Sequence, residues 1–126
     1  MTMFYLKNSV KVADMNRIMA TGRPVRDCVL SDIQDKKLCK FCLACKGDYY
    51  VEDKIKTNFI RCVAWDKTAD ILVNNVKKGD LICVYGALDS REKENKEIVW
   101  EIKVEKVELL AKTENKEQPK DDNLPF

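Results

Sequence analysis

A single amphipathic helix, set between segments with strand alternation, is the feature that most restricts the fold of this chain. Four apolar residues recur at the i, i+3, i+4 and i+7 positions of one helical face: Ala69, Leu72, Val73 and Val76. Asp66 is a suitable N-cap residue, and Gly79 is a suitable stop. Lys77 and Lys78 would lie at the negative end of the helix dipole. The sequence therefore predicts one helix, from Asp66 to about Gly79, that buries one face.

Five segments have the residue pattern of β-strands, three before the helix and two after it. They cover residues 17–21, 37–45, 57–65, 81–88 and 98–109. The first is expected to end at a Gly22-Arg23-Pro24 turn. Residues 46–56 and 89–97 are expected to form polar loops, the second of them mobile. The alternation of the last segment shifts by one residue after Val104, which predicts a β-bulge or a bend inside the strand.

The segment 57–65 has two faces of different chemistry. One face is suited to a core and carries Ile60, Cys62 and Ala64. The opposite face places an arginine between two aromatic rings and carries Phe59, Arg61, Val63 and Trp65. The order of three strands, a helix and two strands, with a bent last strand, suits an all-β protein with one helix. We therefore expect a five-stranded barrel with the helix between strands three and four, the oligonucleotide/oligosaccharide-binding (OB) architecture.

Length and composition limit the classes of function. The 126 residues suffice for one domain, and 45% of them are hydrophobic. No apolar run reaches membrane-spanning length, and residues 1–7 lack the pattern of a signal peptide, so we expect a cytoplasmic protein. Residues 111–126 carry three lysines against four acidic residues, a net charge of −1, which leaves +3 on the rest of the chain. A weakly basic domain is compatible with a polyanionic partner.

The six cysteines are expected to behave as small buried hydrophobic residues in a reducing compartment. Cys39, Cys42 and Cys45 have a spacing that is seen in metal sites, but steps of three residues along a strand place neighbours on opposite faces. The sequence has no histidine, no phosphate-binding glycine loop and no nucleophile elbow. We therefore expect no metal, no other cofactor and no enzymatic activity.

The chain ends in two aspartates, an apolar pair around a proline, and a phenylalanine that carries the free carboxyl group. These residues are Asp121, Asp122, Asn123, Leu124, Pro125 and Phe126. The polar stretch 112–120 before them cannot bury enough surface to fold on itself. An aromatic ring beside several carboxylates suits a peptide ligand for a basic, apolar pocket on a partner. The alternative is a frayed terminus without function.

Four pieces of the sequence resemble the single-stranded DNA-binding protein (SSB) family of bacteria and phages. They are the opening Met15–Arg23, the third strand and helix start Phe59–Ala69, the helix end and fourth strand Lys77–Leu88, and the acidic tip Asp121–Phe126. The resemblance implies an OB fold that assembles as a homotetramer and coats single-stranded DNA without sequence preference in replication, recombination and repair. It also implies that the tip recruits replication and repair proteins.

The resemblance divides the chain into four parts. They are an N-terminal extension at 1–14, an OB domain at 15–110, a short disordered linker at 111–120 and the tip at 121–126. The extension and the shortness of the linker depart from the family pattern. Tyr49 and Lys93 stand at positions where members of the family commonly have tryptophan.

A protein that binds any sequence can use the π-face and the phosphate that all nucleotides share. The candidate stacking residues are Phe59, Trp65, Tyr49 and Tyr50. Positions that the family uses or tolerates as basic are occupied by Arg17, Arg61, Lys67, Lys78 and Arg91. Candidates from location alone are Arg23, Lys40 and Lys93. We expect Trp100 in the core or in a subunit interface, because it is in phase with Ile98 and Ile102.

Two other hypotheses keep the barrel but change its role. One is a primosome-type, plasmid or phage accessory protein that acts mainly through protein contacts; the acidic tip argues against it. The other is a structural adaptor, in which the face with Phe59, Arg61 and Trp65 is buried against another protein.

Overall fold

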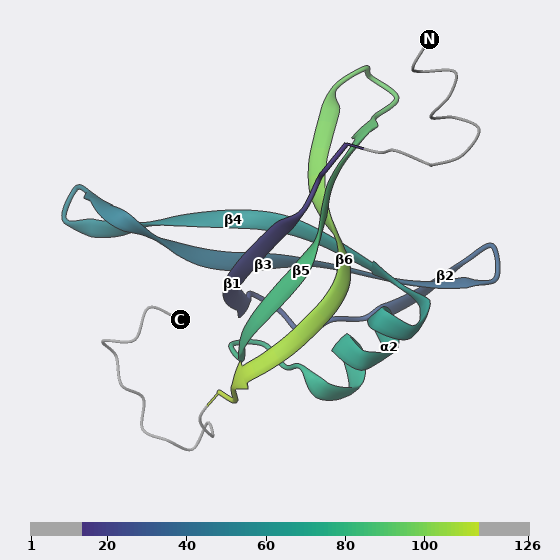
Figure 1. Ribbon diagram of the computed structural model, residues 1–126, viewed down its shortest axis with the longest axis horizontal. Helices are drawn as coiled ribbons and strands as arrows, with labels where there is room; N and C mark the ends of the chain where they lie inside the picture. The colour runs from purple at the N-terminus through teal and green to yellow at the C-terminus, as the bar shows by residue number, and fades with distance from the viewer. Residues whose placement is uncertain (1–13, 114–126) are drawn as a thin grey trace, which may run out of the picture.

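The computed structural model describes residues 14–113, which form a barrel with one helix and long projecting hairpins (Figure 1). The elements, in chain order, are β1 (Ile18–Pro24), β2 (Leu30–Ile33), β3 (Lys36–Val51), β4 (Lys54–Trp65), α2 (Asp66–Asn75), β5 (Leu81–Glu92) and β6 (Ile98–Ala111). Within these residues, no helix has the length and apolar character needed to cross a membrane.

Five of the strands close into a ring in the order β1–β5–β6–β4–β3–β1. The closing contact joins β1 to β3 through the pairs Arg23↔Ala44 and Pro24↔Leu43. A side chain at Gly22 would overlap the Ala44 carbonyl group, so the close approach of these strands requires glycine. All neighbours in the ring are antiparallel except β4 and β6, which run parallel. The predicted OB architecture, with the helix between the third and fourth barrel strands, is confirmed.

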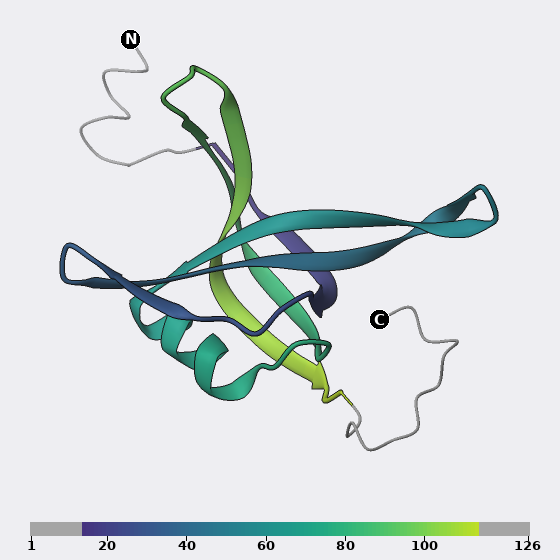
Figure 2. The same ribbon diagram turned by 180° about the vertical axis from the view of Figure 1, so that it is seen from behind.

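The core lies inside the ring and beneath the helix. Its fully buried aliphatic side chains are Leu43, Leu72, Ile82, Val84 and Ile102. The predicted apolar stripe of the helix is confirmed, because Ala69, Leu72 and Val76 are buried and Val73 packs against the same cluster. Figures 1 and 2 show α2 lying across one end of the barrel, beside β6 and the β2–β3 hairpin. The helix therefore covers an end of the barrel that strands alone would leave open.

Most of the loop predicted at 46–56 is strand, whereas the loop predicted at 89–97 is strand only as far as Glu92 and remains a loop at 93–97. The pair Val51↔Lys54 extends the β3–β4 hairpin to a turn at Glu52-Asp53, so the loop expected at 46–56 was wrong. The pair Glu92↔Ile98 likewise extends the β5–β6 hairpin into the loop expected at 89–97. Both hairpins project well beyond the barrel (Figure 1). A projecting ribbon has no core on either face, which explains why its strands have the composition of loops.

Two further strand predictions were wrong. β1 continues through Gly22, Arg23 and Pro24, where we expected a turn, because this stretch closes the ring against β3. β2 was not predicted, since only Leu30 of its four residues is even partly buried and no apolar alternation marks it. It pairs with β3 alone and forms the edge of the sheet.

The helix starts and ends differently from the prediction. Asp66 is the first helical residue rather than the N-cap, and its Oδ1 accepts a hydrogen bond from the backbone N–H of Lys37 at 3.2 Å. The helix ends at Asn75, so Lys77 and Lys78 lie outside its last turn. They belong to the turn before β5, where Gly79 adopts a positive φ of 87°.

The predicted bulge in the last strand is confirmed. Tyr85 pairs with Lys106 and Gly86 pairs with Val104, so Glu105 is the extra residue of β6. A side chain at Gly86 would overlap the Lys103 carbonyl group. The bulge therefore requires glycine on the facing strand.

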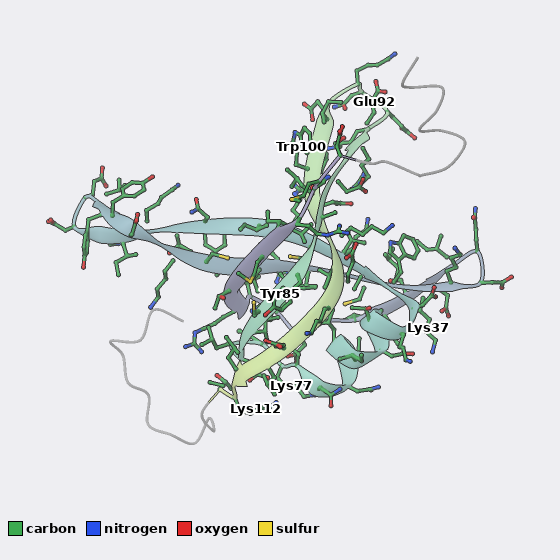
Figure 3. The ribbon with its side chains drawn as sticks, viewed as in Figure 1. Lys37, Lys77, Tyr85, Glu92, Trp100 and Lys112 are labelled. Carbon is green, nitrogen blue, oxygen red and sulfur yellow. The ribbon has the colours of Figure 1, made fainter. Side chains whose placement is uncertain are left out.

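The buried carboxylate of Asp80 joins the end of β6 to the turn before β5. Its oxygens accept hydrogen bonds from the backbone N–H of Lys77 at 2.8 Å and of Thr113 at 2.7 Å. They also receive Lys112 Nζ at 3.0 Å, and Figure 3 shows Lys77 and Lys112 close together. Ala111 is the last residue of β6. The first three residues of the predicted linker at 111–120 thus belong to the folded domain.

The remaining predictions about the termini lie outside the described residues. They concern residues 1–13 of the N-terminal extension, residues 114–120 of the linker and the whole tip at 121–126.

Candidate nucleic-acid interface

The outward face of β3 and β4 carries the predicted row of aromatic and basic side chains. Across the two strands the partners are Leu38↔Trp65, Lys40↔Val63, Cys42↔Arg61 and Ala44↔Phe59. The opposite face of β4 turns Cys62 and Ala64 into the core. The predicted division of β4 into two faces is therefore confirmed. Phe59 is 65% exposed, which is unusual for a large aromatic ring in a barrel strand.

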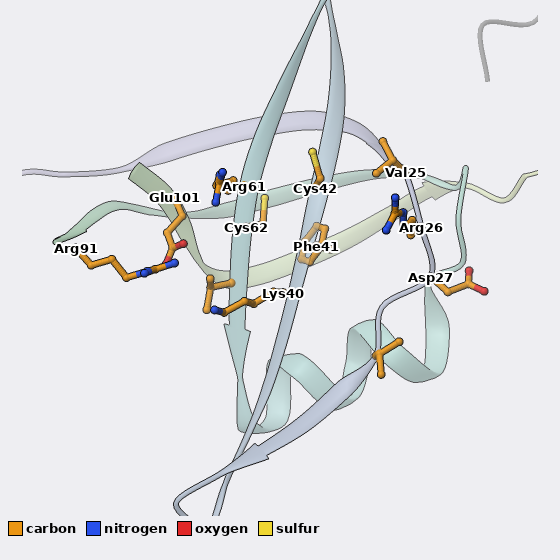
Figure 4. A pocket seen from close by; sticks show the side chains of 12 residues that line it. Val25, Arg26, Asp27, Lys40, Phe41, Cys42, Arg61, Cys62, Arg91 and Glu101 are labelled. Carbon is orange, nitrogen blue, oxygen red and sulfur yellow. The ribbon is translucent and has the colours of Figure 1, made fainter. Parts of the chain in front are cut away.

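A groove follows this face. Its first part is a cavity of about 420 Å³ between the segment that follows β1, the middle of β3 and β4, and the base of the β5–β6 hairpin (Figure 4). Its second part, of about 310 Å³, lies on the side of Trp65. Both parts are lined by Lys40, Val63, Arg91 and Glu101. We call these two joined cavities the β3–β4 groove.

The β3–β4 groove has an excess of basic side chains. Its basic residues are Arg26, Lys40, Arg61, Arg91 and Lys103, and its acidic residues are Asp27, Asp89 and Glu101. Two of the acidic side chains already have partners within the chain. Asp27 accepts a hydrogen bond from the backbone N–H of Lys78, and Glu101 forms an ion pair with Arg91. Within the described residues, Arg26, Lys40 and Arg61 make no ion pair. The groove can therefore offer cations to an extended polyanion.

The buried thiol of Cys62 does not add charge to the groove. Cys62 forms part of its lining, and burial raises the pKa of this thiol to about 12, which keeps it neutral. Cys39 and Cys45 pack into the core while Cys42 faces the groove, as the strand alternation predicted. Among the described residues, no group of three histidine, cysteine or acidic side chains is placed to hold a metal ion.

Of the predicted site residues, the groove brings together Lys40, Arg61, Trp65 and Arg91. Phe59 and Lys78 line a separate, mainly apolar cavity of about 360 Å³ together with Pro24, Thr57 and Thr113. Phe59 still shares the outward face of β4 with Arg61 and Trp65. Lys67 is exposed in the first turn of α2, directly after Trp65.

The other predicted residues lie on the projecting hairpins or serve the fold. Tyr49 and Tyr50 are exposed near the tip of the β3–β4 hairpin. Lys93 follows β5 at the tip of the β5–β6 hairpin and pairs with Glu97 at 3.8 Å. Arg17 precedes β1, next to Asn16, whose side chain is hydrogen-bonded to the backbone of Leu88 in β5. None of these residues lines the groove.

Arg23 has a structural contact that the sequence did not suggest. Its Nη1 donates a hydrogen bond to the Gly79 carbonyl oxygen at 2.8 Å, and the N–H of Gly79 donates to the Pro24 carbonyl oxygen. Arg23 therefore holds the turn before β5 against the end of β1.

Of the two places expected for Trp100, the structure excludes the core, and a subunit interface stays a prediction. Ile102, two residues further along the same face of β6, is fully buried, but Trp100 is 57% exposed on the projecting β5–β6 hairpin. Figure 3 shows its place on this hairpin, on the way to Glu92. The alternation was correct, but the strand leaves the barrel before it reaches Trp100.

Sequence reasoning missed several groove residues, among them Lys103, Arg26 and Glu101. Lys103 alternates with buried Ile102 and Val104, so the outward face of the last strand could have indicated it. Arg26 lies in a segment without periodicity, and Glu101 owes its place in the groove to the strand pairing. Arg26 has no local pattern that could have marked it, whereas Glu101 alternates in the same phase as Lys103.

Comparisons with known proteins agree with this geometry. Residues 15–111 match the single-strand binding protein family. A single-stranded DNA-binding protein of Staphylococcus epidermidis is 31% identical over 115 residues, which cover 87% of this chain and 88% of that protein. Single-stranded DNA-binding protein 1 of Streptococcus pyogenes is 33% identical over 107 residues, with coverages of 80% and 82%. The corresponding protein of Caldanaerobacter subterraneus is 34% identical over 79 residues, with coverages of 61% and 53%.

Proposed function

The chain belongs to the single-strand binding protein family, and we propose that it binds single-stranded DNA without sequence preference along the β3–β4 groove. Membership also places it among DNA-binding proteins rather than among enzymes. The observation that carries the proposal is the row of Phe59, Arg61 and Trp65 on the outward face of β4, beside a groove where three cations pair with no described carboxylate. The strand 2–3 face of an OB barrel is the usual place for oligonucleotides, and here that face belongs to β3 and β4.

Stacking on aromatic rings would contribute binding free energy that does not depend on the identity of the base. The rings of Phe59 and Trp65 stand six residues apart in one strand, which corresponds to roughly 20 Å along its axis. Several nucleotides would run between the two rings. Each stacked base contributes about 1–3 kcal/mol in proteins of this kind, whatever its identity. Tyr49 and Tyr50 would extend the stacking surface along the β3–β4 hairpin.

Phosphate contacts would supply the rest. Lys40 and Arg61 line the groove between the two rings, and Arg26 and Lys103 line its two parts. Each phosphate that these cations neutralise releases counterions, so binding should weaken as salt rises, with a log–log slope of about 0.7 per phosphate. Arg17, Lys67, Lys78 and Lys93 lie outside the groove and would attract the strand as it enters or leaves.

We further propose that the protein acts as a homotetramer in the cytoplasm, in replication, recombination and repair. Large apolar side chains are exposed outside the β3–β4 groove and would suit contacts between copies: Met19 of β1 is 65% exposed, and Ile98 and Trp100 of β6 are 54% and 57% exposed.

The acidic tip, Asp121 to Phe126, would recruit replication and repair proteins. The 13 residues after Thr113, the last residue that the structure describes, can span at most about 45 Å.

Titration with poly-dT tests the main proposal. We expect tryptophan fluorescence to be quenched at stoichiometric DNA and the affinity to fall between two salt concentrations. An accessory protein that acts through protein contacts, or an adaptor with this face buried in an interface, would show no salt-dependent quenching. The absence of any binding at low salt would contradict the proposal.

A further inference from the structure

Glu101 is a nearly buried carboxylate in the wall of the β3–β4 groove. It is 7% exposed, lies in β6 and lines both parts of the groove. Its Oε2 accepts a hydrogen bond from Nε of Arg91 at 3.3 Å, across the β5–β6 hairpin. Figure 4 shows the carboxylate of Glu101 and the guanidinium of Arg91 directed toward each other. A negative charge in the wall of the groove repels a polyanion, so the presence of Glu101 there requires a structural explanation.

The two partners of this ion pair differ in exposure. The side chain of Glu101 is 9% exposed, whereas that of Arg91 is 45% exposed. A buried carboxylate is costly to leave unpaired, so Glu101 holds the arginine at its Nε. Because the guanidinium is planar, fixing Nε also fixes the directions of the two Nη groups. Arg91 lines both parts of the groove, so these Nη groups are the donors that it can offer there.

We propose that Glu101 is a positioning residue for single-stranded DNA: it orients the guanidinium of Arg91 so that the two Nη groups receive a phosphate at the junction of the two cavities. This inference rests on the proposed function. Arg26 and Arg61, the other arginines of the groove, have no such carboxylate partner among the described residues. Arg91 is thus the groove arginine that is ordered before DNA arrives.

Ordering the Arg91 side chain before DNA binds should change the dissociation constant by a measurable factor. Fixing one long side chain at an interface corresponds to about two- to tenfold in the dissociation constant. The carboxylate also repels phosphate, so removing Glu101 mixes two opposite effects. The experiment must separate the loss of the hydrogen-bond acceptor from the loss of the charge.

Two variants of similar size make this separation. Glu101→Gln removes the charge but keeps an oxygen that can accept from Arg91 Nε, whereas Glu101→Met removes both. We expect Glu101→Met to bind a dT oligonucleotide about two- to tenfold more weakly than Glu101→Gln. In an Arg91→Ala background the two variants should bind equally. Equal affinities in the presence of Arg91 would overturn the proposal, and so would a difference that persists unchanged without Arg91.

A second readout does not depend on DNA. In 15N NMR spectra, exchange of the Arg91 Nε–H with solvent should be slow in the unaltered protein and in Glu101→Gln, and fast in Glu101→Met. If Glu101→Met does not fold, Glu101→Asp replaces it in the experiment. The aspartate side chain is one methylene shorter, which moves the acceptor away from Arg91 Nε. It should weaken DNA binding only when Arg91 is present. Unaltered protein that binds dT but shows fast Arg91 exchange would overturn the positioning role alone. Unaltered protein that fails to bind dT would overturn the proposed function as well.

Discussion

The backbone N–H of Thr113 donates a 2.7 Å hydrogen bond to Oδ1 of Asp80, a residue 33 positions earlier in the chain. Asp80 is fully buried, and its other oxygen accepts from Lys77 N–H and from Lys112 Nζ. One carboxylate therefore ties the last described residues of the chain to the turn before β5.

Replacement of this carboxylate should destabilise the domain. Burial by itself would raise the pKa of Asp80, but the hydrogen bonds from Lys77 and Thr113 and the pairing with Lys112 outweigh it, so the pKa lies below its ordinary value of 3.8. We expect Asp80→Asn to lower the free energy of unfolding at pH 7 by about 1–3 kcal/mol in urea titrations. Asp48→Asn, at an exposed position, is the control.

The lowered pKa also gives a pH dependence with a definite sign. The unfolded chain binds the proton more tightly than the folded one, so this stabilisation is complete above about pH 4 and is lost as pH falls through the lower folded pKa. In Asp80→Asn this part of the acid sensitivity should be missing. Equal acid sensitivity of the free energy of unfolding in both proteins would contradict the assignment.

Arg61 should contribute to the salt dependence of DNA binding. Because it faces the groove between Phe59 and Trp65, we expect Arg61→Ala to weaken dT binding and to reduce the log–log salt slope by about 0.7. Lys106→Ala removes a charge outside the groove, where Lys106 pairs with Glu108 and lies over the Tyr85 ring, and serves as the matched control. A slope that changes equally in both variants would mean that only net charge matters.

The two tryptophans should report differently on DNA. Trp65 lines the groove, whereas Trp100 is exposed on the β5–β6 hairpin. We expect Trp100→Phe to keep most of the fluorescence quenching by poly-dT, and Trp65→Phe to lose most of it and to bind more weakly. If the quenching is lost in Trp100→Phe and kept in Trp65→Phe, the DNA lies on the hairpin rather than along the β3–β4 groove.

Gly86 should tolerate no side chain. Its Cβ would overlap the Lys103 carbonyl group opposite the bulge at Glu105, so β5 and β6 would have to move apart. We expect Gly86→Ala to lower the free energy of unfolding by about 1–3 kcal/mol, as overpacking of a filled site does. Ser90→Ala, exposed in the same strand, should change it little. Similar thermal midpoints for the two variants would contradict the close approach of the strands.

Deletion of Phe126 should separate the two proposed activities. The tip lacks the groove residues, so the shortened chain should bind dT with unchanged affinity. Pull-downs with the unaltered and shortened proteins from the same bacterial extract, compared by mass spectrometry, should lose replication and repair proteins in the shortened form. Capture of the same proteins by both forms would rule out a recruiting role for the terminal phenylalanine.

The part of the site that alternation alone located is the row of side chains that one strand encodes by itself. Phe59, Arg61 and Trp65 alternate within β4, so a period of two residues placed them together before any pairing was known. Arg26 and Glu101 join them only because the segment after β1 and the β5–β6 hairpin fold against β3 and β4. No local pattern contains that information.

The same division holds for the fold. The sequence by itself determined the buried face of α2, the two faces of β4 and the bulge in β6, because each is a periodicity within one element. The tertiary structure alone decided that β1 runs through Pro24 to close the ring and that Trp100 lies outside the core. It also decided that Glu101 holds Arg91. These features depend on contacts between residues far apart in the chain, and such contacts form only when the barrel closes.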